Sequence, residues 1–221
     1  MYISFVDKNG NTIRTDNDLG LTIEKITIGE PKVRSMYKEI PGRDEPIDYT
    51  DYFGQPLYEP RDITIECGAK ITDRFDQERM IRNAVHGLRF DKIILSDDPQ
   101  WCFSGRVSMN EWRKNVRIGK CTLTARCDPY RKKISQTVKT LSLTSAYKSL
   151  SIENTGKIII PVFSSTVATI VKFDGIEYAF AANDQYRNPE IALQKGTSTI
   201  QAKATSGSSG TLTVTYQEGV L

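Results

Sequence analysis

Apolar residues recur at every second position through most of this chain, which is the period of a half-buried β-strand. Leu21–Ile28 alternates in this way apart from one slip at Glu24–Lys25, where we expect a β-bulge. Further strands are predicted at Ile3–Val6, Thr12–Arg14, Asp62–Cys67, Lys92–Leu95, Trp101–Trp112 and Ile118–Cys127. The period therefore restricts the chain to a mainly β fold.

One segment has the period of an α-helix instead. Its apolar face, at helical spacing, consists of Phe75, Ile81, Ala84, Val85 and Leu88. Thr72 or Asp73 can cap its beginning, and Gly87 is a plausible C-terminal stop. A meander of strands with one helix laid across it predicts an N-terminal β-barrel or β-sandwich.

The composition changes after Tyr130. Residues 131–150 are rich in Lys, Ser and Thr and predict an extended connector that can itself join a sheet. Strands are then predicted at Ile158–Phe163, Thr169–Phe173, Ile176–Phe180, Thr199–Thr205 and Thr211–Tyr216, with Asp174–Gly175 as a hairpin turn. These short strands predict a small second β-sandwich. The expected domains are residues 1–133 and 134–221.

The charge of the chain is unevenly distributed. Residues 1–130 carry 20 Lys and Arg against 21 Asp and Glu, whereas residues 131–221 carry 10 against 6. Arg131, Lys132 and Lys133 form one short cluster beside the predicted connector, whereas a nucleic-acid binder would have a broad basic stripe. We interpret the cluster as solvated linker charge and expect no nucleic-acid specificity.

The cysteines indicate core packing rather than metal binding. Cys67, Cys121 and Cys127 share strand parity with apolar neighbours, and no two of the four cysteines, which include Cys102, form a Cys-x-x-Cys pair. We therefore expect reduced thiols acting as small core side chains, and no zinc. No apolar run is long enough to span a membrane and the first residues lack a secretory signal, so synthesis in a cytoplasm is expected.

Few residues offer catalytic chemistry. His86 is the only histidine, and we expect a partly exposed position near the helix end rather than a role as general base. Asp97 and Asp98 precede Pro99, where aspartate serves turn geometry. No phosphate-binding glycine loop, dinucleotide fingerprint or zinc-protease motif occurs. The sequence predicts no enzyme, no catalytic or metal-binding residue and no cofactor.

Two segments are candidates for binding. Residues 41–60 are rich in Pro, Gly, Asp and Tyr and predict a long irregular arm, and such loops are usually functional. In the second module, Tyr186 and Arg187 belong to a predicted exposed loop. Stacking of Tyr186 on a sugar would make the protein a carbohydrate-binding module for host adhesion, although packing within the loop is the favoured interpretation.

The order of several short motifs resembles the siphophage distal tail proteins, and the resemblance covers nearly the whole chain. The N-terminal module has the matching segments Pro41–Asp44, Asp48–Arg61, Leu95–Pro99, Phe103–Val107, Ile118–Gly119 and Cys127–Tyr130. The C-terminal module has Asn154-x-Gly156 before Pro161, then Gly210–Tyr216 and Glu218–Leu221. Their order and spacing together carry the resemblance.

The resemblance implies a structural virion protein at the tip of a long non-contractile phage tail, the hub of its baseplate. Six copies of the N-terminal belt module would close a ring, and a galectin-like or carbohydrate-module-like sandwich would project outward. The implied partners are the tail tube, tape-measure, tail-tip and receptor-binding or fibre proteins. Synthesis in the cytoplasm of the bacterial host and final location in the virion follow from the same resemblance.

Such a ring would need contacts between subunits, and the arm offers them. Aromatic and arginine side chains anchor protein interfaces. The candidate intersubunit residues are Arg43, Tyr49, Tyr52, Phe53 and Tyr58. The alternative is an arm that folds back onto its own module.

Overall fold

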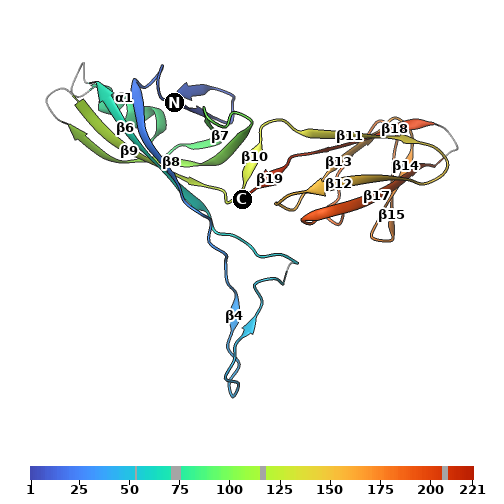
Figure 1. Ribbon diagram of the computed structural model, residues 1–221. Helices are drawn as coiled ribbons and strands as arrows, with labels where there is room; N and C mark the ends of the chain where they lie inside the picture. Colours follow the sequence, from blue (N-terminus) through green and yellow to red (C-terminus); the bar gives the residue numbers. More distant parts are fainter. Residues whose placement is uncertain (53, 71–75, 115–117, 206–208) are drawn as a thin grey trace. The chain divides into compact units, whose positions relative to one another are not determined.

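A computed structural model describes residues 1–52, 54–70, 76–114, 118–205 and 209–221. The chain divides into two compact units, Met1–Arg131 and Lys132–Val220, whereas the sequence places the division after Lys133. We call them the first and second units; Figure 1 shows the ribbon of each. Strands dominate both, and the predicted mainly β fold is confirmed.

The first unit contains an antiparallel sheet whose strands run in the order β2-β1-β7-β8-β9-β6-β3. Their bounds are β1 (Ile3–Val6), β2 (Thr12–Arg14), β3 (Leu21–Ile28), β6 (Arg61–Lys70), β7 (Arg89–Leu95), β8 (Trp101–Lys114) and β9 (Ile118–Cys127). The pairing of β3 with β6 shifts between Ile23 and Lys25, which confirms the predicted bulge.

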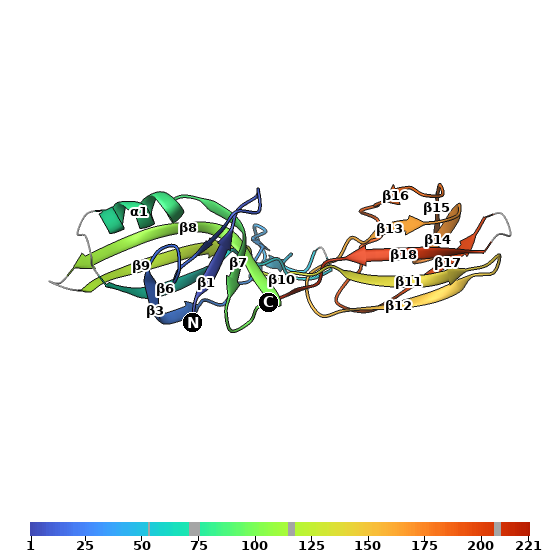
Figure 2. The same cartoon turned by 90° about the horizontal axis from the view of Figure 1, so that it is seen from above.

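The helix α1 (Asp76–Val85) lies over this sheet beside β8, as Figure 2 shows. Ile81 and Val85 are fully buried and join the core. The inclusion of Leu88 in the helical face is wrong: the helix ends at Val85, Gly87 takes a positive φ of 75°, and Leu88 is 45% exposed. The predicted Gly87 stop is confirmed, because a left-handed residue cannot continue the helix. Thr72, Asp73 and Phe75 lie outside the described residues.

The second unit is a β-sandwich of two four-stranded sheets with strand orders β11-β18-β13-β16 and β12-β17-β14-β15. The strands are β11 (Thr137–Leu143), β12 (Lys148–Asn154), β13 (Val162–Ser165), β14 (Thr169–Phe173), β15 (Ile176–Phe180), β16 (Gln185–Tyr186), β17 (Gly196–Ala204) and β18 (Gly210–Tyr216). The short strands β10 (Arg131–Lys133) and β19 (Gly219–Val220) pair with each other. The predicted connector therefore supplies the edge strand β11.

A turn prediction and a strand prediction in this unit have different outcomes. Asp174 and Gly175 have φ values of 47° and 85°, which confirms the predicted hairpin with both central residues in the left-handed region. The predicted strand Ile158–Phe163 is wrong in its first half, because Pro161 has no N–H for a ladder. Ile159 instead forms an isolated bridge with Leu193, and β13 begins at Val162.

The interpretation of Arg131–Lys133 as solvated linker charge is also wrong. Arg131 is half-buried, and its guanidinium lies 3.2 Å from the Asp98 carboxylate. In the second unit, the Lys133 ammonium lies 3.2 Å from Glu218 and is half-buried. Their carboxylate partners are distant in sequence, so composition alone gives no sign of these pairs.

All four cysteines are buried free thiols, as predicted. Cys67 in β6 lies directly opposite Cys121 in β9. A hydrogen bond to Cys121 and burial raise the pKa of the Cys67 thiol, and burial raises the pKa of Cys127 to about 12. The Cys67 and Cys127 thiols are therefore protonated at neutral pH, and all four buried cysteines pack as small apolar groups.

Candidate functional site

Between β3 and β6 the chain leaves the sheet as a narrow extension, visible in Figure 1 around β4. We call residues 29–60 the arm. It is a two-stranded ribbon in which β4 (Tyr37–Lys38) pairs with β5 (Ile47–Asp48). At its root the Gly29 N–H donates to the Asp62 carbonyl at 2.9 Å. The predicted irregular arm of residues 41–60 is thus the return half of a longer hairpin.

Hydrogen bonds within the arm hold its two halves together. The Tyr49 N–H donates to the Met36 carbonyl at 2.7 Å, and the Met36 N–H donates to the Thr50 hydroxyl at 3.2 Å. The Asp48 carboxylate accepts the Thr50 N–H at 2.8 Å, and its hydrogen bonds with Thr50 lower the pKa of Asp48. The arm is an ordered ribbon that satisfies much of its own backbone.

The arm exposes an unusual amount of apolar surface. Among the described residues, seven of the fourteen exposed large apolar side chains lie between positions 28 and 52: Ile28, Val33, Met36, Tyr37, Ile40, Tyr49 and Tyr52. None of them belongs to the buried core of the first unit. A contiguous segment with this composition is typical of a surface that another protein covers.

The structure places the predicted arm residues in two groups. Tyr49 and Tyr52 lie edge to face, 6.4 Å apart between ring centroids, and Tyr52 is 73% exposed. Arg43 is exposed in the turn between β4 and β5. Tyr58 is half-buried near the root, where its ring packs against Tyr130 at 5.9 Å. Phe53 lies outside the described residues.

The charges of the arm segregate between its halves, a feature that the sequence interpretation missed. Residues 30–43 carry four basic and two acidic side chains. Residues 44–59 carry no basic side chain and five acidic ones: Asp44, Glu45, Asp48, Asp51 and Glu59. Counting charge along each half of the hairpin, rather than over the whole module, would have found it.

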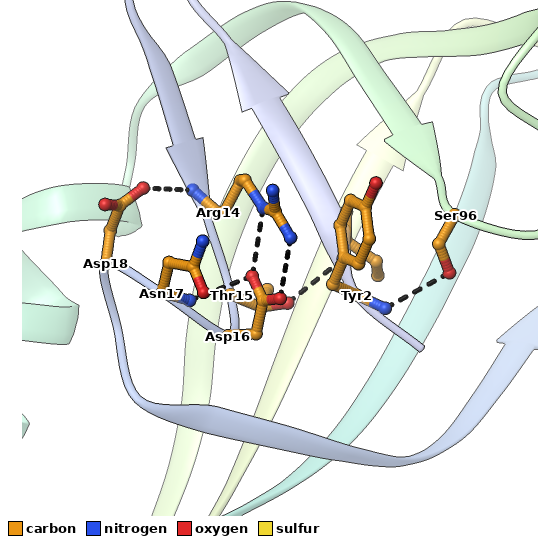
Figure 3. Close-up of polar contacts among 8 residues, drawn as sticks. Tyr2, Arg14, Thr15, Asp16, Asn17, Asp18 and Ser96 are labelled. Carbon is orange, nitrogen blue, oxygen red and sulfur yellow. Dashed lines mark hydrogen bonds and ion pairs between the residues drawn. The ribbon is translucent and has the colours of Figure 1, made fainter.

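The two edges of the first unit's sheet differ. At the β2 edge, shown in Figure 3, the Arg14 N–H donates to the Asp18 carboxylate at 2.7 Å. The Arg14 guanidinium pairs with Asp16 at 2.7 Å and lies 3.9 Å from the centroid of the Tyr2 ring. The side chains of Asp16 and Asp18 thus bind Arg14 at this short edge strand. The opposite edge strand, β3, has eight residues and pairs with β6 alone among the described strands.

The predicted exposed loop of the second unit is different in the structure. Tyr186 lies in β16 and is half-buried, because one face of its ring stacks on Phe180 at 5.2 Å and 6°. Its hydroxyl accepts a hydrogen bond from the Asn188 amide at 3.1 Å. Arg187 is exposed and lines a 210 Å³ cavity with Lys132 and Lys157. Tyr186 therefore belongs to the packing of the sandwich.

His86 makes a structural contact with the backbone of β8. It follows α1, is exposed, and its Nδ1 accepts the Met109 N–H at 3.0 Å. The register of β8 with β9 shifts between Met109 and Glu111, so the imidazole binds backbone at a bulge. The described residues contain no group of three or more His, Cys, Asp or Glu side chains placed to hold a metal ion. No helix in the described part of the chain is both long and apolar enough to cross a membrane.

Comparison with protein-family models finds no match, and neither does comparison with curated proteins. The fold is similar to the crystal structure of SPP1 Dit (gp 19.1), described as a paradigm of the hub adsorption apparatus in phages that infect Gram-positive bacteria. The TM-score is 0.66 at 18% sequence identity, over 100% of this chain and 99% of that one. The resemblance to distal tail proteins inferred from the motifs is thus confirmed at the level of the fold.

Proposed function

We propose that this protein is a structural hub of a phage tail tip rather than an enzyme. The observation that carries the proposal is the likeness to SPP1 Dit, because it extends over the whole length of both chains and includes both units. In this account copies of the first unit close a ring and the second unit carries other tail-tip proteins. The protein is then a component of the virion.

The arm supports the assembly of copies. Seven exposed large apolar side chains lie in or beside it, and covering them removes apolar surface from water at about 25 cal/mol per Å². Tyr49 and Tyr52 are the strongest anchors, since tyrosines bury a large area at little cost in side-chain entropy. Tyr58 supports the root of the arm within its own chain.

A closed ring needs two different complementary surfaces on each copy. The first unit has this asymmetry, because its arm lies on the β3 side of the sheet and its β2 edge is occupied by side chains. Residues 1–130 carry nearly balanced charge, 20 basic against 21 acidic, so copies can pack without strong repulsion. Six copies are proposed from the resemblance to distal tail proteins.

The proposed partners are the tail tube, tape-measure and tail-tip proteins and the receptor-binding or fibre proteins. The second unit is the basic part of the chain, with 10 Lys and Arg against 6 Asp and Glu in residues 131–221. That excess favours partners with acidic surfaces and steers their approach. A galectin-like sandwich would present them with its loops and outer faces.

Size-exclusion chromatography with light scattering tests the proposal on the full chain. We expect a particle of about six times 24.9 kDa at high micromolar concentration. The double variant Tyr49→Ser/Tyr52→Ser should weaken association by roughly tenfold or more, because it removes both interface anchors. The matched control is Ile176→Ser, which removes a 57% exposed apolar side chain from the second unit. A strictly monomeric wild-type protein would contradict the proposal.

A further inference from the structure

Three arginines form a row across the outer face of the first unit's sheet. Arg89 in β7 lies directly opposite Arg106 in β8, and Arg106 lies directly opposite Arg126 in β9. Asp62 in β6 continues the row beyond Arg126. All three arginines are exposed, and their strand parity is opposite to that of the buried core residues.

Like charges directly opposite each other on neighbouring strands destabilise a sheet. Arg89 is partly compensated by Asp128, whose carboxylate lies 3.4 Å from its guanidinium. The Arg106 guanidinium donates to the Gly87 carbonyl, which is a neutral acceptor. Arg126 has no ion pair with any carboxylate of the described residues. Asp128 and Asp62 flank the two ends of the row and compensate it in part, so a further acidic group at Arg106 and Arg126 would relieve the remaining repulsion.

The row lines a groove of about 510 Å³ that also has polar side chains in its walls. Ser108, Asn110 and Thr124 supply hydroxyl and amide groups, and the Asn110 amide donates to the Thr124 hydroxyl at 2.7 Å. Pro60, at the root of the arm, lies at its margin. A groove crossing several strands suits an extended segment that offers carboxylates, because guanidinium binds carboxylate through paired hydrogen bonds.

We propose that this arginine row receives the acidic return half of the arm from a neighbouring copy. The inference rests on the proposed ring and specifies the surface on which its contact is made. The return half carries five acidic side chains and no basic one. Within the described residues no ion pair joins these acids to the arginine row of the same chain. Arm and row are different surfaces of one unit, as head-to-tail closure requires.

The groove fits a protein segment better than a simple polyanion. Asp62 and Asp128 line it together with the arginines, so a uniformly negative polymer would meet two carboxylates. The arm has mixed charge, because its outgoing half carries Lys32, Arg34, Lys38 and Arg43. An arm in the groove can therefore pair its carboxylates with the arginines and its basic side chains with Asp62 and Asp128.

The test begins with charge reversal in the full chain. Arg106→Glu/Arg126→Glu should raise the dissociation constant of assembly at least about tenfold and shift the light-scattering mass toward the monomer. Lys195→Glu, an exposed reversal in the second unit, is the matched control and should assemble like wild type. Tryptophan fluorescence confirms that the first unit is folded, since Trp101 and Trp112 both lie there.

Reversal on the arm provides the complementary variant. Asp44→Arg/Glu45→Arg should also weaken assembly, because it places positive charge opposite the row. An equimolar mixture of the two variants contains two compatible pairs, native arm with native row and reversed arm with reversed row, so alternating copies should recover assembly. All four substitutions in one chain should restore the wild-type mass. Higher salt should weaken the wild-type assembly by screening the contact.

The outcomes separate this inference from the proposed function. If Arg106→Glu/Arg126→Glu assembles as the wild type does, the arginine row is not the contact, and the proposed ring is unaffected. If the variant with all four substitutions does not regain the wild-type mass, the arginine row is likewise not the contact. A wild-type protein that never assembles overturns both. If the row variant assembles normally but loses binding to a single-stranded oligonucleotide, the row is a polyanion site and the inference is wrong.

Discussion

His86 shows how a residue that suggests chemistry can serve the backbone. Its Nδ1 accepts the Met109 N–H at the bulge in β8, so His86→Ala leaves that donor without this partner. We expect a loss of about 1 kcal/mol in the unfolding free energy of the first unit, measured by denaturation with tryptophan fluorescence. His86→Asn keeps an acceptor in reach and should recover much of it. Equal stability of wild type and His86→Ala would contradict this role.

Tyr186 distinguishes packing from sugar binding in the second unit. Tyr186→Ala removes the ring that stacks on Phe180 and should lower the stability of this unit by about 2 kcal/mol, visible in calorimetry. Tyr186→Phe keeps the stack and should cost less, since only the hydroxyl contact with Asn188 is lost. An unchanged melting profile together with lost glycan binding would support the carbohydrate-binding alternative instead.

The alternation of strand residues predicted which side chains are buried in many strands. It did not predict ion pairs between residues far apart in the chain. Alternation within the predicted strand Ile176–Phe180 places Tyr178 and Phe180 on one face, and both are 9% exposed. Arg131 looked like linker charge because its partner, Asp98, lies 33 residues earlier in the chain. Such a pair depends on how β10 is placed, which no local pattern encodes.

Glu218, which lies between β18 and β19, contacts side chains of β10 and β11. Its carboxylate accepts a hydrogen bond from the Thr137 hydroxyl and pairs with Lys133, and these contacts lower its pKa below the ordinary 4.5. A carboxyl whose folded pKa is depressed stabilises the fold above its unfolded pKa, and this contribution is lost as the pH falls through the folded value.

The corresponding experiment is calorimetry of the full chain. Between about pH 6 and about pH 3, wild type should lose more stability in the second unit than Glu218→Gln, which lacks this titration. Glu153→Gln, an exposed carboxyl in the same unit, should follow the wild-type curve. Parallel curves for wild type and Glu218→Gln would contradict the linkage.

The arm should be dispensable for folding, whereas the proposed assembly requires it. Replacing residues 35–55 with a short Gly-Ser linker preserves the root, where the Arg34 N–H donates to the Leu57 carbonyl at 2.7 Å. We expect the unfolding free energy of the first unit to change by less than about 0.5 kcal/mol, because the arm contributes no residue to the core. The light-scattering mass should fall to that of a monomer. Loss of folding would show that the arm is part of the domain.

Elements with a buried face were predictable and those without one were not. The bulge in β3 and most strand bounds followed from alternation. The strands β4 and β5 have two residues each and are largely exposed, so they leave no hydrophobic period. Pro161 ended the ladder at a place where apolar residues alone suggested a strand.

At the scale of the whole molecule, charge and exposed apolar surface divide between different parts of the chain. The first unit is nearly neutral and has the arm, while the second unit carries the excess of basic residues. The proposed division into an assembling unit and a partner-binding unit rests on this distribution and on the likeness of the fold to SPP1 Dit.

Native mass spectrometry of the full chain tests the central claim, assembly into a closed ring, most directly. The account predicts a dominant species of about 149 kDa, six copies of the 24.9 kDa chain, and no open-ended series of larger masses. Negative-stain images of that species should show rings. A single species of 24.9 kDa at every concentration, or an unlimited ladder of oligomers, would contradict it.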